Sequence, residues 1–363
     1  MIFSSGWSMP CPIDQSYRVL AARAVRRQIK QLTAQIEGIR KAEDAEPLHR
    51  ARVASRRLRQ ALDVFEDCFA KDRAVLWRKQ MGRLGRELGK ARDRDVQIAW
   101  ITELLGQVND HRCVPGMAAV LVRCQRKRDR LQPDVLRSFR QLLEGRVLHE
   151  MLAATKKLIA AAEANHVAEK SPVVFERAEE HIAARARALC EFEPCLDRFD
   201  DVDRHHAMRI AAKRLRYTME LFRPLFEGQL DRVLEAVKQV QSLLGDVHDC
   251  DIWLGQLDKM LRKESKRLAR HYRHSGPLAA LTPGVELLKS ECRRRRRLRF
   301  ATLVEFWREQ SNAGLWGELS EILGRRRILA PEVPPGSRRT AARGREGIAP
   351  FPAAGTPRIF EAG

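Results

Sequence analysis

Apolar residues along most of this chain recur at steps of three and four, which is the spacing of one face of an α-helix. The first such run begins near Tyr17 and continues to Ile36. Pro47 stands where a first helical residue can be proline, and it opens a second helix that reaches about Phe69. Alternating runs of β-branched and aromatic residues, which are typical of strands, are almost absent. The pattern therefore predicts an all-α fold.

The same spacing predicts further helices in both halves of the chain. In the first half they cover residues 72–88, a stretch around 95–101, then 116–130 and 134–162, with a loop at 108–115. The second half has a helix at 173–190, an acidic loop at 191–203, a helix to Phe226, a break at Gly228, and helices to about Gly324. We expect two related helical bundles packed together. The predicted boundaries are a flexible N-terminus at 1–14, a first bundle at 15–162, a linker at 163–172, a second bundle at 173–328 and a tail at 329–363.

One stretch of the sequence occurs twice. The first copy runs from His49 to Phe65, and the second runs from His206 to Phe222. A histidine, an arginine, a β-branched residue, an alanine, a basic pair, a leucine, an arginine and a phenylalanine recur in the same order and at the same spacing. The chain therefore contains an internal duplication.

Each copy divides its residue types between two sides of a helix. At about 100° per residue, the histidine and three arginines of the first copy fall within an arc of roughly 80°, and its leucines fall opposite. A solvated basic face over an apolar one is the ordinary interpretation. However, the basic stripe has almost no carboxylate, and like charges at these spacings destabilise an isolated helix. Because both copies keep the stripe, we interpret it as a site for a polyanion.

A second landmark follows each copy. Residues 88–96 and 244–252 share a leucine, a glycine and two aspartates in the same order. A glycine that ends one helix and an aspartate that opens the next are ordinary helix punctuation, so both stretches are interpreted as junctions between helices. Their spacing of about 157 residues matches that of the stripes.

Composition narrows the class of partner. The 363 residues are 44% hydrophobic, which suffices for a substantial core and about two domains. Lys and Arg number 68 against 47 Asp and Glu, which gives a net charge of +21. Such an excess indicates nucleic acid, an anionic membrane surface or a phosphate polymer. The guanidinium groups that dominate the stripes suit bidentate contact with phosphate oxygens.

Cysteine usage and hydropathy indicate the compartment. The eight cysteines form no C-x-x-C pair and are interpreted as reduced thiols, mostly in the core. The N-terminal residues lack the pattern of an export signal, and no apolar run approaches the ~18 residues of a membrane span. We expect a soluble cytoplasmic protein without a membrane partner.

The two His-x-x-Arg-x-x-x-[Arg/Lys]-Arg-Leu-Arg segments, each followed by Leu-Gly-x-x-[Arg/His]-Asp-x-Asp-[Val/Ile], resemble the CHAD family, the conserved histidine α-helical domain. The resemblance covers roughly residues 15–325. It implies two pseudo-symmetric helical bundles whose basic faces line a central channel that binds inorganic polyphosphate. It also implies an association with polyphosphate granules.

The resemblance assigns the ligand contacts by position. It places His49, Arg52, Arg56, Arg57 and Arg59 on one side of the polymer, and His206, Arg209, Lys213, Arg214 and Arg216 on the other. Arg92 and His248 differ between the two landmarks and are not assigned. No metal or cofactor is expected. The Glu-x-Glu-x-Lys signature of the triphosphate-tunnel barrel, which is often fused to such domains, is absent from the sequence, so we expect a protein that is not an enzyme.

The two histidines leave an alternative open. A polyanion raises the pKa of a nearby imidazole, so each histidine could be cationic in the complex. A neutral histidine buried in a contact between helices is the other interpretation. Loss of binding above neutral pH would favour the cationic form.

A nucleic-acid-binding protein is the strongest rival, because a chain with a charge of +21 attracts DNA and RNA without sequence specificity. Aromatic residues are only 6% and do not interleave the stripes, and no zinc finger, RNA-recognition motif or basic zipper is found. A remoter rival is a metal-dependent phosphohydrolase with His248-Asp249 as metal ligands, since His205 and His206 lie upstream and His271 and His274 downstream.

Five successive arginines, residues 293–297, lie within a predicted long helix between Leu287 and Phe306. Because such a run surrounds the helix, at least two of them should face solvent, and Arg293, Arg294 and Arg297 are additional candidates for anion contact. From about Ala330 the chain is rich in Pro, Gly and Arg, a composition that cannot form a core and predicts disorder. The preferred polymer length and the oligomeric state do not follow from the sequence.

Overall fold

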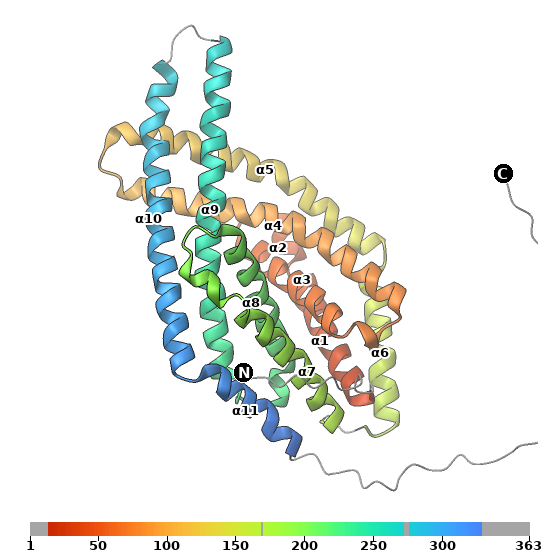
Figure 1. Cartoon of the computed structure of the whole chain (residues 1–363). Coiled ribbons are helices and arrows are strands. Elements are labelled where there is room, and N and C mark those ends of the chain that lie inside the picture. Colours follow the sequence, from red (N-terminus) through yellow and green to blue (C-terminus); the bar gives the residue numbers. More distant parts are fainter. Residues whose placement is uncertain (1–13, 168–169, 272–275, 329–363) are drawn as a thin grey trace, which may run out of the picture.

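The computed structural model describes residues 14–167, 170–271 and 276–328, and every regular element in these ranges is helical (Figure 1). The predicted all-α class is confirmed. The N-terminal residues 1–13 and the predicted tail at 329–363 lie outside the described residues. The α-helices are α1 (Gln15–Thr33), α2 (Ile36–Lys41), α3 (Glu46–Val64), α4 (Lys71–Gln107), α5 (Val114–Glu144), α6 (Val147–Ala164), α7 (Pro172–Cys190), α8 (Val202–Phe222), α9 (Asp231–His271), α10 (Gly276–Asn312) and α11 (Leu315–Ile328). Short segments of 3-10 helix are η1 (Glu66–Cys68), η2 (His111–Cys113), η3 (Glu193–Asp197) and η4 (Arg223–Leu225).

Several helices begin at residues whose side chains accept a hydrogen bond from the first turn. Asp14 caps α1 by accepting from the amide of Tyr17, Ser171 caps α7, and Asp201 caps α8. A side-chain oxygen at this position satisfies one of the amides that the helix leaves unpaired. The starts of α1, α7 and α8 therefore lie close to the predicted ones, whereas α3 and α8 end at Val64 and Phe222, before the predicted Phe69 and Phe226.

The two predicted junctions at residues 88–96 and 244–252 are wrong. Both stretches lie inside continuous helices, α4 and α9. A glycine inside a helix costs only about 1 kcal/mol, which the burial of neighbours such as Leu88 and Leu244 offsets. Gly89 and Gly245 are thus interior positions of long helices.

The predicted break between residues 130 and 134 is also wrong. Pro133 lies within α5, which continues to Glu144, and the turn comes at Gly145 and Arg146 instead. Proline removes one backbone hydrogen bond from a helix. The helix persists because Val135 and Phe139, which follow the proline, are buried in the core.

Two long hairpins dominate the arrangement (Figure 1). Helices α4 and α5 pack side by side as one hairpin, and α9 and α10 form the other. α3 packs on α4, α8 packs on α9, and α3 and α8 also contact each other. Both copies of the repeated sequence therefore lie on neighbouring helices in the middle of the molecule.

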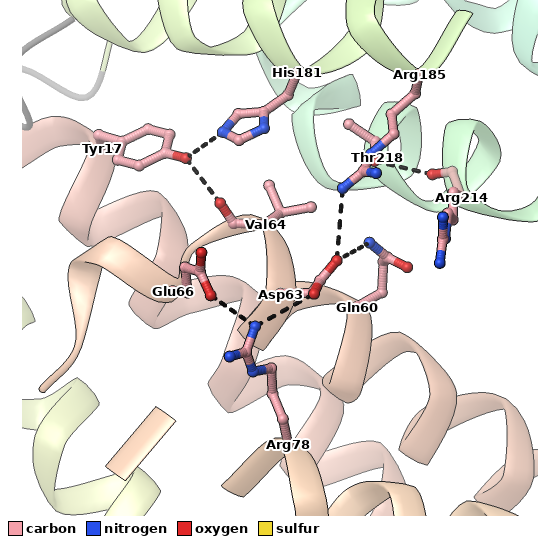
Figure 2. Close-up of polar contacts among 10 residues, drawn as sticks. All are labelled: Tyr17, Gln60, Asp63, Val64, Glu66, Arg78, His181, Arg185, Arg214 and Thr218. Atoms are coloured by element: carbon pink, nitrogen blue, oxygen red, sulfur yellow. Dashed lines mark hydrogen bonds and ion pairs between the residues drawn. The ribbon is translucent and has the colours of Figure 1, made fainter. Parts of the chain in front are cut away.

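One hydrophobic core extends through both halves of the sequence. At its centre Tyr17 of α1, Phe65 and Phe222 pack ring against ring, with centroids 5.1 to 6.4 Å apart. The Tyr17 hydroxyl donates to the carbonyl of Val64 at 3.2 Å and lies 3.0 Å from Nε2 of His181 on α7 (Figure 2). The first and second halves are thus joined by buried apolar and polar contacts.

A second, smaller core lies where the two long hairpins cross. Trp100 of α4 and Trp253 of α9 meet edge to face, with ring centroids 5.1 Å apart.

Seven cysteines lie among the described residues, all as free thiols. Cys190 is half-buried and six are buried, as predicted for core residues: Cys68, Cys113, Cys124, Cys195, Cys250 and Cys292. Within the described ranges no helix combines the length and the apolar character that crossing a bilayer requires.

Candidate functional site

The two basic stripes of the sequence face one region between α3 and α8. His49, Arg52 and Arg56 project from α3, all half-buried. His206, Arg209 and Lys213 project from α8, also half-buried. We call these six residues the stripe cluster.

The cations of the stripe cluster lie close enough to perturb one another across the two helices. Burial lowers the pKa of Lys213 to about 8, and Arg209 and Arg56 contribute to this lowering. The pKa of Arg56 is likewise lowered by burial and by Arg52, Arg216 and Arg209. Because the interacting groups come from both copies of the repeat, one concentrated positive region spans α3 and α8.

Tyr217 forms the floor beneath part of this region. Its ring is buried, with the guanidinium carbons of Arg56 and Arg216 at 5.0 Å and 5.5 Å from the ring centroid. A cation over an aromatic face is electrostatically favourable. Within the described part of the chain, the Tyr217 hydroxyl, Nε of Arg56 and Nδ1 of His49 have no hydrogen-bond partner. The site therefore holds polar atoms whose bonding capacity is unused.

The repeated Leu-Gly landmarks contribute to the site instead of ending helices. A β-carbon at Gly89 would lie 3.6 Å from Nε of Arg52, and one at Gly245 would lie 4.0 Å from Nε of Arg209. Arg52 also reaches Asp93 at 3.9 Å, and the Asp249 carboxylate acts on Arg209. The landmarks thus lie beside the two arginines, and a β-carbon at either glycine would still fit at ordinary contact distance. The sequence-based interpretation as helix junctions missed this position, although the parallel spacing of stripe and landmark in both copies was a usable signal.

Each stripe histidine faces one of the two residues left unassigned by the sequence. Nδ1 of His206 lies 3.2 Å from Nδ1 of His248, and the charge of Arg92 acts on His49. Burial, Arg209 and His206 lower the pKa of His248 to about 4. The pKa values of His49 and His206 are also lowered, first by burial and then by neighbouring arginines. Without a ligand, burial and the neighbouring cations thus favour the neutral form of the three imidazoles.

Three other predicted arginines lie at the end of the stripes or outside them. Glu220 of α8 joins the two helices, since it pairs with Arg57 at 3.0 Å and Arg216 at 2.8 Å. A cavity of about 470 Å³ adjoins this triad, with Arg27 and Lys238 also on its walls. Arg59 is exposed and lies against Gly82 of α4.

Arg214 is exposed on α8, where its carbonyl accepts a hydrogen bond from Thr218 (Figure 2). In the same view, Asp63 of α3 pairs with Arg185 of α7 and Arg78 of α4. Arg214 and Arg59 are exposed, whereas the six members of the stripe cluster are half-buried.

At least two of the five successive arginines of α10 face solvent, as predicted. Arg293, Arg294 and Arg297 are exposed, and Arg294 pairs with Glu291 on the same helix. Arg295 pairs with Asp246, and the buried Arg296 binds Asp251 at 2.6 Å and the carbonyl of Phe199. α10 packs on α9 and α5, so these arginines lie on a helix separate from the two that carry the stripe cluster.

The residues of the metal-site alternative are directed to different partners. His248 contacts His206, while His205 is buried and its Nε2 lies 3.0 Å from the carbonyl oxygen of Cys195. His274 lies outside the described residues. Among the residues that are described, no group of three or more His, Cys, Asp or Glu side chains is arranged to hold a metal ion.

Comparison with known proteins identifies relatives of this arrangement. A protein-family model described as the CHAD domain matches residues 23–258, which include both stripes and both landmarks. The crystal structure of the CHAD domain from the plant Ricinus communis matches with a TM-score of 0.58 and 21% identity, over 87% of this chain and 96% of that one. The structure of PptA from Streptomyces chartreusis matches with a TM-score of 0.50 and 14% identity, over 80% of this chain and 99% of that one.

Two curated relatives come from strains of Mycobacterium tuberculosis, CDC 1551 and H37Rv, and both are described as uncharacterized proteins. Each is 29% identical over 238 residues, which are 62% of this chain. The chain spans less than half of their length, since the match covers 42% of each.

Proposed function

Because this chain belongs to the CHAD domain family, with which polyphosphate binding is associated, we propose that it binds inorganic polyphosphate and does not act on it as an enzyme. The polymer would lie between α3 and α8 in a basic channel formed by two pseudo-symmetric halves. The stripe cluster would provide the central contacts, and Arg57, Arg59, Arg214 and Arg216 would extend them. By the same inference the protein acts in the cytoplasm and associates with polyphosphate granules.

The observation that carries this proposal is the meeting of two like-charged stripes from distant parts of the chain. Arg52 and Arg56 face Arg209 and Lys213, and burial together with repulsion from these arginines lowers the pKa of Lys213. Asp93 and Asp249 are the carboxylates that act on this group of charges. A fold that holds cations in this way is stabilised by any bound anion that neutralises several of them together.

Polyphosphate matches the chemistry of this region. It carries dense charge and has no bases, so guanidinium and ammonium groups suffice to bind it and stacking aromatics are not needed. The ring of Tyr217 is buried beneath two guanidinium groups, so it presents no open face on which a base could stack.

The test is binding of defined-length polyphosphate at several salt concentrations. The variant changes Arg52, Arg56, Arg209 and Lys213 to Gln, which removes four charges and keeps most of each aliphatic stem. We expect the affinity to fall by about a hundredfold or more, and the salt dependence to become shallower by about 0.7 for each phosphate that the variant no longer neutralises. Circular dichroism and thermal melting would verify that the variant folds.

The matched control removes the same number of charges elsewhere, by changing Arg293, Arg294, Arg297 and Lys157 to Gln. Their side chains are exposed on α10 and α6. The control should bind polyphosphate nearly as well as the unmodified protein. If the control loses binding and the stripe variant keeps it, the stripes are structural and the proposal is wrong.

Non-specific nucleic-acid binding is the second candidate, favoured by the net charge of +21 and by the exposed arginines of α10. Competition separates the two functions. Short polyphosphate should displace labelled single-stranded RNA of matched charge, and RNA should displace polyphosphate poorly. The reverse order would favour the nucleic-acid function.

A further inference from the structure

A second group of cations lines a cavity away from the stripe cluster. The cavity, of about 330 Å³, lies between α4, α5 and α9. Its walls carry Arg94, Arg123, Lys127, Lys259 and Lys263, together with Gln256 and Met260. We call the five cations the outer cluster.

Among the described residues, no carboxylate neutralises the positive charges of the outer cluster. No carboxylate lines the cavity, and none of the five cations is ion-paired within the part of the chain that the structure describes. Burial lowers the pKa of Lys127, and Arg94, Arg123 and Lys263 lower it further. Three helices thus bring like charges together at one place without an internal counterion.

The geometry of this cavity is fixed by amide side chains. Arg94 binds Oε1 of Gln97 and, at 3.0 Å, Oε1 of Gln256, so its guanidinium is held between α4 and α9. On the α5 side, Arg123 and Lys127 are also shared with a neighbouring cavity of about 540 Å³, whose walls add Arg126 and Arg130. The positive surface therefore continues along α5.

The outer cluster continues the stripe cluster along one side of α9. His248, which contacts the stripe residue His206, is followed at steps of four, four, three and four by Ile252, Gln256, Lys259 and Lys263. Residues at these steps lie on the same side of a helix. With a rise of 1.5 Å per residue, Lys259 lies roughly 16 Å and Lys263 roughly 22 Å along the axis from His248. A short anion could not span this distance, but a polymer could.

We propose that the outer cluster binds a further segment of the same polyphosphate chain that the stripe cluster holds, so that the protein discriminates long polymers from short ones. This proposal rests on the proposed function. The walls of the cavity contain cations, an amide and a thioether, and no aromatic side chain on which a base could stack. The chemistry therefore favours a chain of phosphates over single-stranded nucleic acid.

The test uses the full chain with tripolyphosphate and with a polyphosphate much longer than about 22 Å, the span from His248 to Lys263 on α9. The outer variant changes Arg123, Lys127, Lys259 and Lys263 to Gln and leaves the bridging Arg94 in place. We expect its affinity for the long polymer to fall about tenfold or more, with a salt dependence shallower by about 0.7 for each phosphate left without its cation. Its affinity for tripolyphosphate should be unchanged.

A matched control changes Arg140, Lys79, Lys156 and Lys157 to Gln. It removes one arginine and three lysines, as the outer variant does, from exposed positions on α5, α4 and α6. Its affinity for both ligands should stay within about twofold of the unmodified protein, since distant exposed charges are screened by salt. If control and outer variant weaken long-polymer binding equally, only net charge matters and the outer cluster is not a site.

The stripe variant described above separates this proposal from the proposed function. If the stripe variant loses tripolyphosphate and the outer variant binds the long polymer normally, only the outer cluster is refuted. If the stripe variant still binds tripolyphosphate, the proposed function itself fails. Displacement of long polyphosphate by single-stranded RNA of equal charge, dependent on the outer cluster, would assign that cluster to nucleic acid and overturn the proposal.

Discussion

At the scale of one residue, Lys213 shows that the stripe cluster lowers the stability of the ligand-free folded protein. Its ammonium is half-buried among arginines of both stripes, and its pKa is lowered to about 8 from the ordinary value of 10.5. The folded state therefore binds this proton less tightly than the unfolded state does. The cost is fully present below pH 8, and it disappears as the pH rises through the interval between the two pKa values.

We expect the free energy of unfolding, without ligand, to rise between about pH 8 and pH 10.5. Lys213→Gln should stabilise the protein at pH 7 by on the order of 1–3 kcal/mol and should remove this part of the pH dependence. Urea unfolding at a series of pH values measures both effects. An unchanged stability at pH 7 would show that neither burial nor the neighbouring cations destabilise the charged form of Lys213.

The stripe histidines should make the affinity for polyphosphate fall as the pH rises, whereas the stability of the ligand-free protein should rise with pH. The pKa values of His49 and His206 are lowered in the free protein, and a bound polyanion would raise them. Binding would then take up protons, so affinity for polyphosphate should increase as the pH falls from 8 to 6. Titration calorimetry in buffers of different ionisation enthalpy measures the proton uptake.

A variant with His49→Gln and His206→Gln should lose most of this dependence below pH 7.5, whereas Lys213→Gln should keep it. A flat affinity between pH 6 and pH 8 in the unmodified protein would instead identify the histidines as neutral packing residues. The alternative left open by the sequence would then be decided.

At the scale of an element, glycines in the long helices have two different roles. Gly89 and Gly245 leave ordinary contact distance between an added β-carbon and an arginine side chain. Gly116 and Gly284 instead lie at the crossing of α5 and α10, where an added β-carbon would come within 2.1 Å of Leu281 O or 2.0 Å of Cys113 O. At the first pair a β-carbon would fit, whereas at the second pair the absence of a β-carbon permits two backbones to touch.

Alanine substitution should distinguish these roles. Gly89→Ala or Gly245→Ala should raise the free energy of unfolding by about 0.5–1 kcal/mol, because alanine favours a helix interior. Gly116→Ala or Gly284→Ala should lower it by about 1–3 kcal/mol, because the backbones must separate. Thermal unfolding compares the four variants. Destabilisation by Gly89→Ala would indicate that α4 is interrupted there.

At the scale of the whole molecule, the two halves of the sequence share one core. Tyr17 from the first half contacts His181 and Phe222 from the second, and its hydroxyl is bonded to groups from both halves. Separate stability of the two halves would require separate cores. The continuous core predicts that they unfold together.

We expect a single transition in urea when unfolding is followed by circular dichroism and by tryptophan fluorescence. Tyr17→Phe should lower the free energy of unfolding by about 1–2 kcal/mol, because it leaves the Val64 carbonyl without its donor. The midpoint of unfolding should shift by the same amount in circular dichroism and in tryptophan fluorescence. Two resolved transitions, or a shift in only one probe, would contradict a shared core.

Local sequence predicted a large part of this molecule. The positions of α1, α3, α7 and α8 follow from apolar spacing, since this signal acts within a few residues. The caps Asp14 and Ser171, which the structure places at the starts of α1 and α7, are signals of equally short range. The helix breaks expected at Gly89, Pro133 and Gly245 were wrong for a related reason. A glycine or a proline lowers the stability of a helix locally, and packing against other helices decides whether the helix continues through it.

The sequence by itself determined the helical class, the duplication and the charge of both stripes, because periodicity and composition are properties of neighbouring residues. Only the tertiary structure decided that α3 lies on α8, that Arg56 and Lys213 share one region, and that Arg92 and His248 face the stripe histidines. Which of the 68 basic residues repel one another depends on distances between segments far apart in the chain. Electrostatic energy falls as those distances grow, and the spacing of residues along one helix gives no information about them.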